Sequence, residues 1–170
     1  MQGVEALRAL KDALYAAIPA RQRQSRGITW VVQRIAGLLA SECGSPEQIR
    51  DLAITLYDHL PDGDLVLGVP IFLMAEYGKT HPTEVFGFFA RVADSEDWVV
   101  REFAAGGFHK LIKPCWETVS PWLRETAQSE SPKLRRFVSE TLRPVTDNRW
   151  LNDRPECSLA ILRLLFREPH

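Results

Sequence analysis

The chain has 170 residues, of which 45% are hydrophobic and 25% are charged. This length suits one domain with an extended core, and the composition is globular rather than disordered. No apolar run approaches the roughly 18 to 20 residues that cross a bilayer, and residues 1–14 lack the apolar core of a signal peptide. We therefore expect a single cytoplasmic domain over residues 1–170, with no membrane partner.

The spacing of cysteines and histidines argues against a metal centre or a disulfide framework. The three cysteines, Cys43, Cys115 and Cys157, are widely separated and form no CxxC pair. The four histidines show no HxxxH or HExxH spacing. We expect neither a metal nor a cofactor.

The net charge of −1 is unevenly distributed along the chain. Residues 1–100 carry 9 basic and 13 acidic side chains, whereas residues 101–170 carry 12 basic and 9 acidic ones. Of the 21 basic residues 16 are arginine, whose planar guanidinium suits phosphate. The basic C-terminal part favours an anionic partner, although arginines paired with glutamates on helix surfaces would produce the same composition.

Apolar residues recur at three- and four-residue steps almost throughout, which predicts an all-α protein. We expect nine helices, near residues 3–17, 27–41, 46–60, 65–77, 82–92, 98–112, 116–123, 132–141 and 155–165. Ser45-Pro46 and Ser131-Pro132 predict two of the helix starts, since serine can cap a helix and proline fits its first position. Pro70 is expected to disturb the fourth helix, and Pro121 to kink the seventh or reset its start.

An internal period of 34 residues organises these helices. The segment VREFA at residues 100–104 aligns with LRRFV at residues 134–138, and Phe88-Phe89 aligns with Trp122-Leu123 at the same separation. A weaker copy lies 34 residues earlier, around Ile54 and Leu65-Val66. Repeated helix pairs are typical of helical-repeat proteins of the HEAT-like, armadillo-type kind. We predict a right-handed superhelical solenoid of antiparallel helix pairs (an α-α superhelix), whose concave side is the working surface.

The last repeat reads as truncated, because its final helix resembles the outer helix of a pair and no inner partner follows. The chain is then either a fragment or a protein whose apolar edge is covered by a partner or by a second copy; without such an edge contact we expect a monomer. In HEAT-like stacks an arginine at the position of Arg101 usually bonds a carboxylate of the neighbouring repeat. Phe88 and Trp122 are expected in the core, and Trp98 between repeats.

Residues 134–144, with the sequence LRRFVSETLRP, are followed by Asn148-Arg149-Trp150. This string resembles the R-R-x-V-S-E-G-T-R-P-R motif, followed by tryptophan, of the HEAT-like DNA alkylation-repair glycosylases (AlkC/AlkD-like superfamily). Residues 101–104 resemble an S-E-F-A-I-R-P segment one repeat earlier in that family. The likeness spans roughly residues 45–170, and its specific motif covers about twenty of them. The chain departs from the motif at Thr141-Leu142, at Gly106-Gly107 and in a tryptophan two residues further from the glutamate.

The resemblance implies a DNA repair enzyme, a glycosylase and hydrolase that cleaves the N-glycosidic bond of cationic alkylpurines such as 3-methyladenine in duplex DNA. It would make Glu140 the catalytic carboxylate, Glu102 a second active-site carboxylate and Trp150 the aromatic residue beside the sugar. A carboxylate can stabilise an oxocarbenium-like sugar without a cofactor, since the cationic base leaves without protonation. A further carboxylate of the family would lie beyond His170.

Phosphate contacts would come from the basic residues around this motif: Lys133, Arg135, Arg136, Arg143, Arg149 and Arg154. Such contacts position DNA without reading its sequence and make binding salt-dependent. The alternative is a non-catalytic HEAT-like module that binds DNA or protein through the same surface. Arg136 and Glu140, four residues apart, would then be an ordinary pair on a helix surface.

Overall fold

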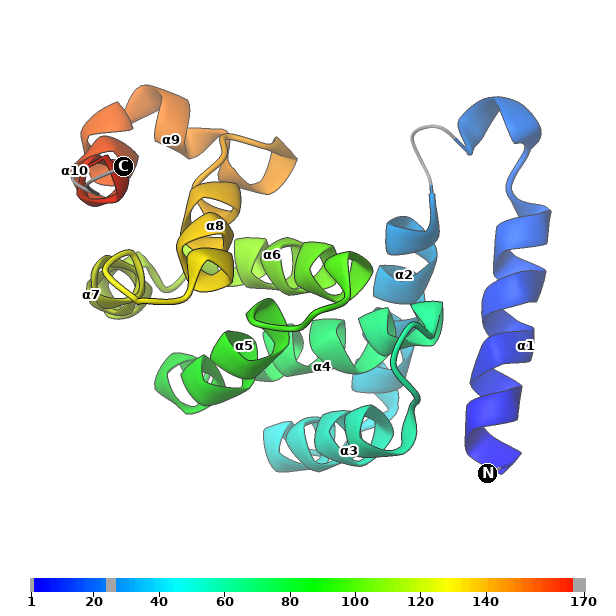
Figure 1. Ribbon diagram of the computed structural model, residues 1–170. Helices are drawn as coiled ribbons and strands as arrows, with labels where there is room; N and C mark the ends of the chain where they lie inside the picture. The colour runs from blue at the N-terminus through cyan, green and yellow to red at the C-terminus, as the bar shows by residue number, and fades with distance from the viewer. Residues whose placement is uncertain (1, 24–26, 167–170) are drawn as a thin grey trace. The chain divides into compact units, whose positions relative to one another are not determined.

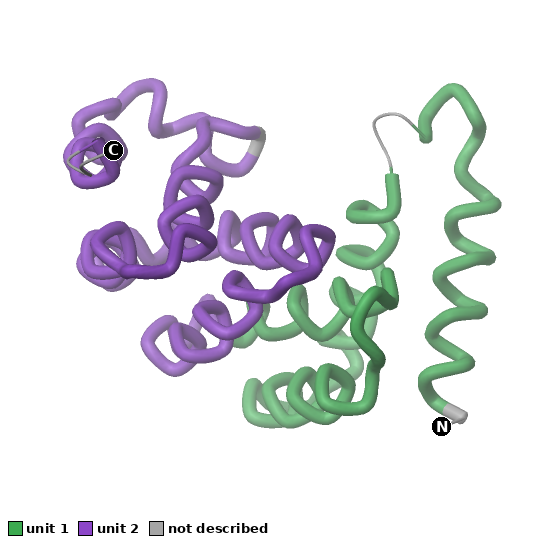
Figure 2. Tube along the Cα trace, in the orientation of Figure 1, with its two compact units in different colours: residues 1–77 green, residues 78–170 purple. Residues whose placement is uncertain are grey.

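The computed structural model describes residues 2–23 and 27–166 (Figure 1). All regular structure in these residues is helical, with ten α-helices, four short 3-10 helices and no strand. The predicted all-α class is therefore confirmed. The chain divides into two compact units, Met1–Tyr77 and Gly78–His170, and each is described by itself (Figure 2). No helix in the described ranges is both long and apolar enough to cross a membrane.

The first unit contains four α-helices that agree with the sequence prediction to within a few residues. They are α1 (Gln2–Ala17), α2 (Ile28–Glu42), α3 (Pro46–His59) and α4 (Gly68–Gly78), with 3-10 turns η1 (Ala20–Gln22) and η2 (Leu65–Leu67). The predicted cap of α3 is confirmed, because the Ser45 hydroxyl accepts a hydrogen bond from the backbone N–H of Gln48. The Gln48 side chain in turn accepts from the N–H of Gly44 at 2.7 Å. The returning bond thus reaches the residue before the capping residue, rather than Ser45 itself as in a standard capping box.

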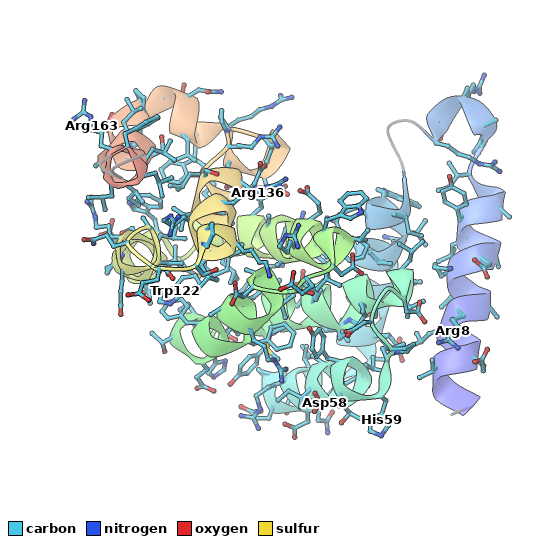
Figure 3. All side chains as sticks on the ribbon, viewed as in Figure 1. Arg8, Asp58, His59, Trp122, Arg136 and Arg163 are labelled. Carbon is cyan, nitrogen blue, oxygen red and sulfur yellow. The ribbon has the colours of Figure 1, made fainter. Side chains whose placement is uncertain are left out.

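A single carboxylate joins α1 to the turn before η2. Arg8 Nε lies 2.7 Å from Asp64 Oδ2, and the other oxygen of Asp64 accepts from the N–H of Val66. The hydrogen bond to Asp64 raises the pKa of the Arg8 guanidinium. Figure 3 shows Arg8 on α1. Because α1 also packs against α2, this ion pair adds a second, polar attachment for the helix.

The expected disturbance of the fourth helix at Pro70 is wrong. The helix α4 begins at Gly68, so Pro70 lies in its first turn, where the missing N–H leaves no intrahelical bond unmade. Ile71, Phe72 and Leu73 follow and are all buried, although they point in different directions around the helix. A helix that is apolar on every side is stable only when it is enclosed, and α4 is such a helix.

The second unit contains the remaining α-helices. Its α-helices are α5 (Phe86–Ala93), α6 (Trp98–Ile112), α7 (Trp116–Thr126), α8 (Pro132–Thr141), α9 (Trp150–Asp153) and α10 (Pro155–Leu165), with 3-10 turns η3 (Pro82–Val85) and η4 (Thr146–Asn148). The helix α6 packs against α5, α7 and α8, while α10 contacts α7, α8 and α9 (Figure 1). The short α9 and η4 were not predicted from the sequence. Two apolar side chains, Leu159 and Phe166, remain exposed at and just beyond α10.

Aromatic rings form the core between α5, α6, α7 and α8. The ring of Phe108 lies 5.1 Å from those of Phe89 and Trp122 and 5.3 Å from that of Phe137. Phe86 stacks on Trp122 at 4.7 Å with the ring planes 5° apart. Trp122 therefore joins this aromatic cluster, but Trp122 and Phe88 are both half-buried rather than in the buried core that the sequence predicts. The expectation for Trp98 is wrong, because this residue is 65% exposed.

Pro121 lies inside α7, which runs without interruption from Trp116 to Thr126. The proline therefore does not reset the start of the helix. It has no N–H to donate to the carbonyl of Glu117, so α7 lacks one intrahelical bond at this position. Pro121 itself is exposed, and water can satisfy the free carbonyl.

The 34-residue period is visible in the hydrogen bonds that begin α6 and α8. Arg101 Nη1 donates to the carbonyls of Ser95 and Glu96 at 2.7 and 2.8 Å. One period later, Arg135 Nη1 donates to the carbonyls of residues 129 and 130, both at 2.8 Å. We call this arrangement the arginine clamp. Arg101 thus bonds its own loop rather than a neighbouring carboxylate, which corrects the expectation from HEAT-like stacks.

Candidate functional site

Four charged side chains lie in sequence across α6, α8 and the residues after α8. Arg136 Nη2 lies 3.3 Å from Glu102 Oε1, and Arg136 Nε lies 4.0 Å from Glu140 Oε1. The second oxygen of Glu140 accepts from Arg143 Nη1 at 2.7 Å. We call Glu102, Arg136, Glu140 and Arg143 the charged row; Figure 3 shows Arg136 on α8. The structure therefore brings together the two glutamates predicted as active-site carboxylates.

The arginine clamps explain why Glu102 and Arg136 meet. Each clamp sets the start of its helix relative to the preceding loop, so that equivalent residues of α6 and α8 take equivalent positions. Glu102 follows the first clamp arginine directly, and Arg136 follows the second. Because α6 and α8 pack side by side, these two residues become neighbours across the helix pair. Glu140 lies one helical turn beyond Arg136, on the same face.

The charged row lies at the surface. The side chains of Arg136 and Arg143 are 58% and 62% exposed, and that of Glu102 is 45% exposed, while Glu140 is the most enclosed at 25%. The hydrogen bond to Glu140 raises the pKa of Arg143. Exposed ion pairs of this kind contribute about 0 to 1 kcal/mol each, since solvent screens them. These pairs can therefore exchange partners with little loss of stability.

Little space adjoins the two glutamates. The cavity that Glu102, Arg136, Phe137 and Glu140 line measures about 10 Å³. A single water needs roughly 10 to 15 Å³, so the cavity has room for about one water molecule. A deoxyribose cannot enter it, and both oxygens of Glu140 already face an arginine. A sugar could reach Glu140 only from the outer surface, after Arg143 moves away.

The six cations predicted to bind phosphate divide into three groups. Arg135 forms a clamp, and Lys133 donates to the carbonyl of Asp94 and to the carboxylate of Glu96. Arg136 and Arg143 belong to the charged row. The remaining two, Arg149 and Arg154, are exposed, and their side chains form no hydrogen bond or ion pair with the residues described.

Trp150 lies apart from the charged row. Its ring meets that of Trp116 edge to face, with centroids 5.3 Å apart and the planes 76° apart. Its indole Nε1 is buried and has no hydrogen-bond partner in the described part of the chain. Trp150 lines a different cavity, of about 530 Å³, which shares no lining residue with the small cavity beside Glu140. The structure thus places two of the three predicted catalytic residues together and does not bring the third to them.

Sequence reasoning missed the groups that hold the end of α8. His109 Nε2 lies 2.9 Å from the backbone carbonyl oxygen of Glu140, and the side-chain amide of Asn148 donates to the carbonyl of Thr141 at 3.1 Å. Burial lowers the pKa of His109, which favours the neutral imidazole. His109 precedes Glu140 by 31 residues, and no motif links the two positions.

The described residues contain no cluster of three or more histidine, cysteine, aspartate or glutamate side chains that could hold a metal ion. What the charged row offers chemically is a carboxylate pair whose charge is balanced by two arginines.

Comparisons with protein-family models, with curated proteins and with solved structures found no match for this chain.

Proposed function

We propose that this chain is a HEAT-like helical-repeat protein of the DNA alkylation-repair type that binds duplex DNA through its charged row. The observation that carries the proposal is the pairing of Glu102 with Arg136, which equivalent positions of α6 and α8 supply. In a stack of repeats, a row of this kind extends from one repeat to the next, because each repeat contributes side chains at equivalent positions. A right-handed α-α superhelix of antiparallel helix pairs is the architecture in which such a row lines one concave surface.

The matching starts of α6 and α8 support the repeat architecture. Asp97 caps α6 by accepting from the N–H of Val99, and Ser131 caps α8 by accepting from the N–H of Leu134. Ser95 and Ser129, also 34 residues apart, both accept from the N–H of the capping residue two positions later. Two loops that share three kinds of hydrogen bond support the interpretation that they are copies of one structural unit.

Duplex DNA suits the exposed cations of this unit. Arg136 and Arg143 are more than half exposed and hold their glutamates in weak surface pairs. A phosphate would compete for the same guanidinium groups, while Arg149 and Arg154 would bind phosphate without giving up a partner. Binding would then release counterions and weaken steeply as salt rises.

Glycosylase chemistry is the first candidate activity of this surface. When DNA phosphates draw Arg143 away, one side of the Glu140 carboxylate becomes free. Arg136 then remains between Glu140 and Glu102. Such a carboxylate stabilises the cationic sugar that forms as an alkylated purine leaves, and it orients the attacking water. In the free protein, Arg136 and Arg143 would keep both oxygens of Glu140 paired until DNA binds.

Binding without catalysis is the second candidate. It is favoured by the arginines that face both Glu140 oxygens, by the small volume beside them and by the position of Trp150 in another cavity. In this case the charged row is a surface that positions DNA, and Glu140 only orients Arg136 and Arg143.

One experiment separates these candidates. The protein is incubated with methylated duplex DNA and the released 3-methyladenine is measured, while binding to the same duplex is measured by fluorescence anisotropy at low and high salt. A glycosylase releases base, and Glu140→Gln abolishes release but retains binding. The matched control is Glu156→Gln, an exposed glutamate of α10 outside the charged row, and it should retain both properties.

Binding without release supports the non-catalytic module. Release that survives Glu140→Gln removes Glu140 from the reaction. Absence of duplex binding even at low salt overturns the whole proposal.

A further inference from the structure

A second cavity of the C-terminal unit combines aromatic walls with unpaired charges. It lies between the start of α7 and the α9 region, and its volume of about 530 Å³ is sufficient for a mononucleotide. Two tryptophans, Trp116 and Trp150, belong to its wall. Both are partly exposed, and their edge-to-face contact holds the two indoles at a steep angle. A planar ring can therefore stack on one indole and meet the edge of the other.

The same cavity offers several groups that bind anions. Lys113 and Arg154 line it, are exposed, and form no hydrogen bond or ion pair with other described residues. The N-terminus of α7 also lies there, and the capping residue Cys115 makes no side-chain hydrogen bond to it. The first backbone N–H groups of a helix have no partner within the helix, and its dipole attracts negative charge. Two cations and an uncapped helix of 11 residues thus converge on one cavity.

Two carboxylates complete the wall. Glu117 and Asp153 line the cavity and, like the two cations, are exposed and unpaired within the described ranges. A ligand with only an anionic group would form no hydrogen bond with these two carboxylates. A ligand that also carries hydrogen-bond donors, such as the exocyclic amine of a nucleobase, can use them as acceptors.

We propose that this cavity binds a nucleotide, with the base against Trp116 and Trp150 and the phosphate held by Lys113, Arg154 and the start of α7. The proposal does not rest on the DNA-binding function, because the cavity shares no lining residue with that beside the charged row and requires no duplex. Arg154, which the proposed function also assigns to a DNA phosphate, is common to both proposals. AMP is a suitable probe, since adenine presents both a broad ring and an exocyclic amine.

Isothermal titration calorimetry of the full chain with AMP, adenosine and inorganic phosphate tests each part of the site. AMP should bind more tightly than adenosine or phosphate by about tenfold or more, because only AMP engages the indoles and the cations together. The double variant Lys113→Gln/Arg154→Gln should weaken AMP by about tenfold while leaving adenosine unchanged. The control is Arg163→Gln, an exposed arginine of α10 outside this cavity (Figure 3), and it should bind AMP normally.

Tryptophan fluorescence provides a second readout that needs no charge variant. AMP should quench part of the emission, Trp150→Phe should reduce that quenching because only Trp116 then remains in the wall, and Trp98→Phe should retain it because Trp98 lies outside the cavity. AMP that binds no better than phosphate, or an affinity unaffected by the Lys113/Arg154 double variant, overturns the proposal. So does loss of AMP binding in Glu117→Gln/Asp153→Asn without loss in the double variant, because the phosphate would then contribute nothing to the affinity.

Discussion

The imidazole of His109 on α6 and the backbone carbonyl of Glu140 on α8 are joined at 2.9 Å. A neutral imidazole that carries its proton on Nε2 donates this hydrogen bond, and burial lowers the pKa of His109 so that the neutral form persists. The hydrogen bond to the Glu140 carbonyl and the nearby Asp147 oppose this shift, while Arg143 and Lys110 reinforce it. The end of α8, and with it the position of Glu140, is thus held by a buried histidine, because Nε2 carries a proton in the neutral Nε2–H tautomer and in the imidazolium alike.

This relationship predicts that the protein loses stability in mild acid. Between the lowered pKa of folded His109 and the value of about 6.5 in the unfolded chain, the unfolded state binds more protons. The contribution of His109 to the free energy of unfolding should therefore be fully present above about pH 6.5, and it should be lost as the pH decreases below this value. Urea midpoints measured from pH 8 to pH 5 test this, with His109→Gln as the reference, because glutamine can donate but does not titrate. Equal pH dependence in the two proteins would contradict the prediction.

The arginine clamp predicts a loss of stability when Arg101 is shortened. Arg101→Gln removes a charged donor from two loop carbonyls, and hydrogen bonds to charged groups contribute roughly 1.5 to 3 kcal/mol. We expect the free energy of unfolding to fall by about 1 to 3 kcal/mol, since the site is only partly buried. The control Arg124→Gln replaces an exposed arginine of α7 and should change it by less than about 0.5 kcal/mol. Chemical denaturation of both variants provides the measurement; equal effects would show that the clamp contributes nothing.

Asn148 predicts a difference between two substitutions at one buried position. Its side-chain amide donates to the carbonyl of Thr141, while its Oδ1 is buried without a partner among the described residues. Asn148→Ala removes the donor and should cost about 1 to 3 kcal/mol. Asn148→Asp places a second acceptor against that carbonyl and should cost more, with part of the loss recovered at low pH as the carboxyl protonates. Thermal unfolding at pH 7 and pH 4.5 separates the two, and an aspartate variant as stable as the alanine variant would refute this account.

Arg149 predicts the salt dependence of DNA binding, under the proposed function. Each phosphate contact adds about 0.9 to the slope of log affinity against log salt concentration. Arg149→Gln should lower this slope by about that amount without loss of stability, since the side chain is exposed and unpaired. Arg163→Gln on α10 is the matched control. Anisotropy titrations at several salt concentrations measure the slope, and an unchanged slope removes Arg149 from the interface.

Local physics made most of the helices predictable. Ser45, Asp97 and Ser131 stand where the first helical N–H groups need an acceptor, and each accepts such a bond in the structure. The apolar periodicity located α5 to α8 because these helices bury one face against their neighbours. By contrast, α9 has only four residues and carries too little pattern to be recognised.

The errors in the prediction arose where a residue's surroundings matter more than its type. Trp98 is a large apolar residue, yet its side chain is mostly exposed, so residue type alone did not predict its burial. Pro70 breaks a helix only when it lies beyond the first turn, and the start of α4 at Gly68 placed it within that turn. The clamp arginines turned back to their own loops because those carbonyls lie within reach.

The amino-acid sequence by itself determined that the chain is helical, where the capped helices begin, and that a 34-residue unit recurs. These properties depend on periodicity and on groups a few residues apart. Only the tertiary structure decided that Arg136 meets Glu102, that His109 meets Glu140, and that Trp150 meets Trp116. Each of these pairs is separated by 31 residues or more, so their contact depends on how α6, α7, α8 and α9 pack rather than on any local preference.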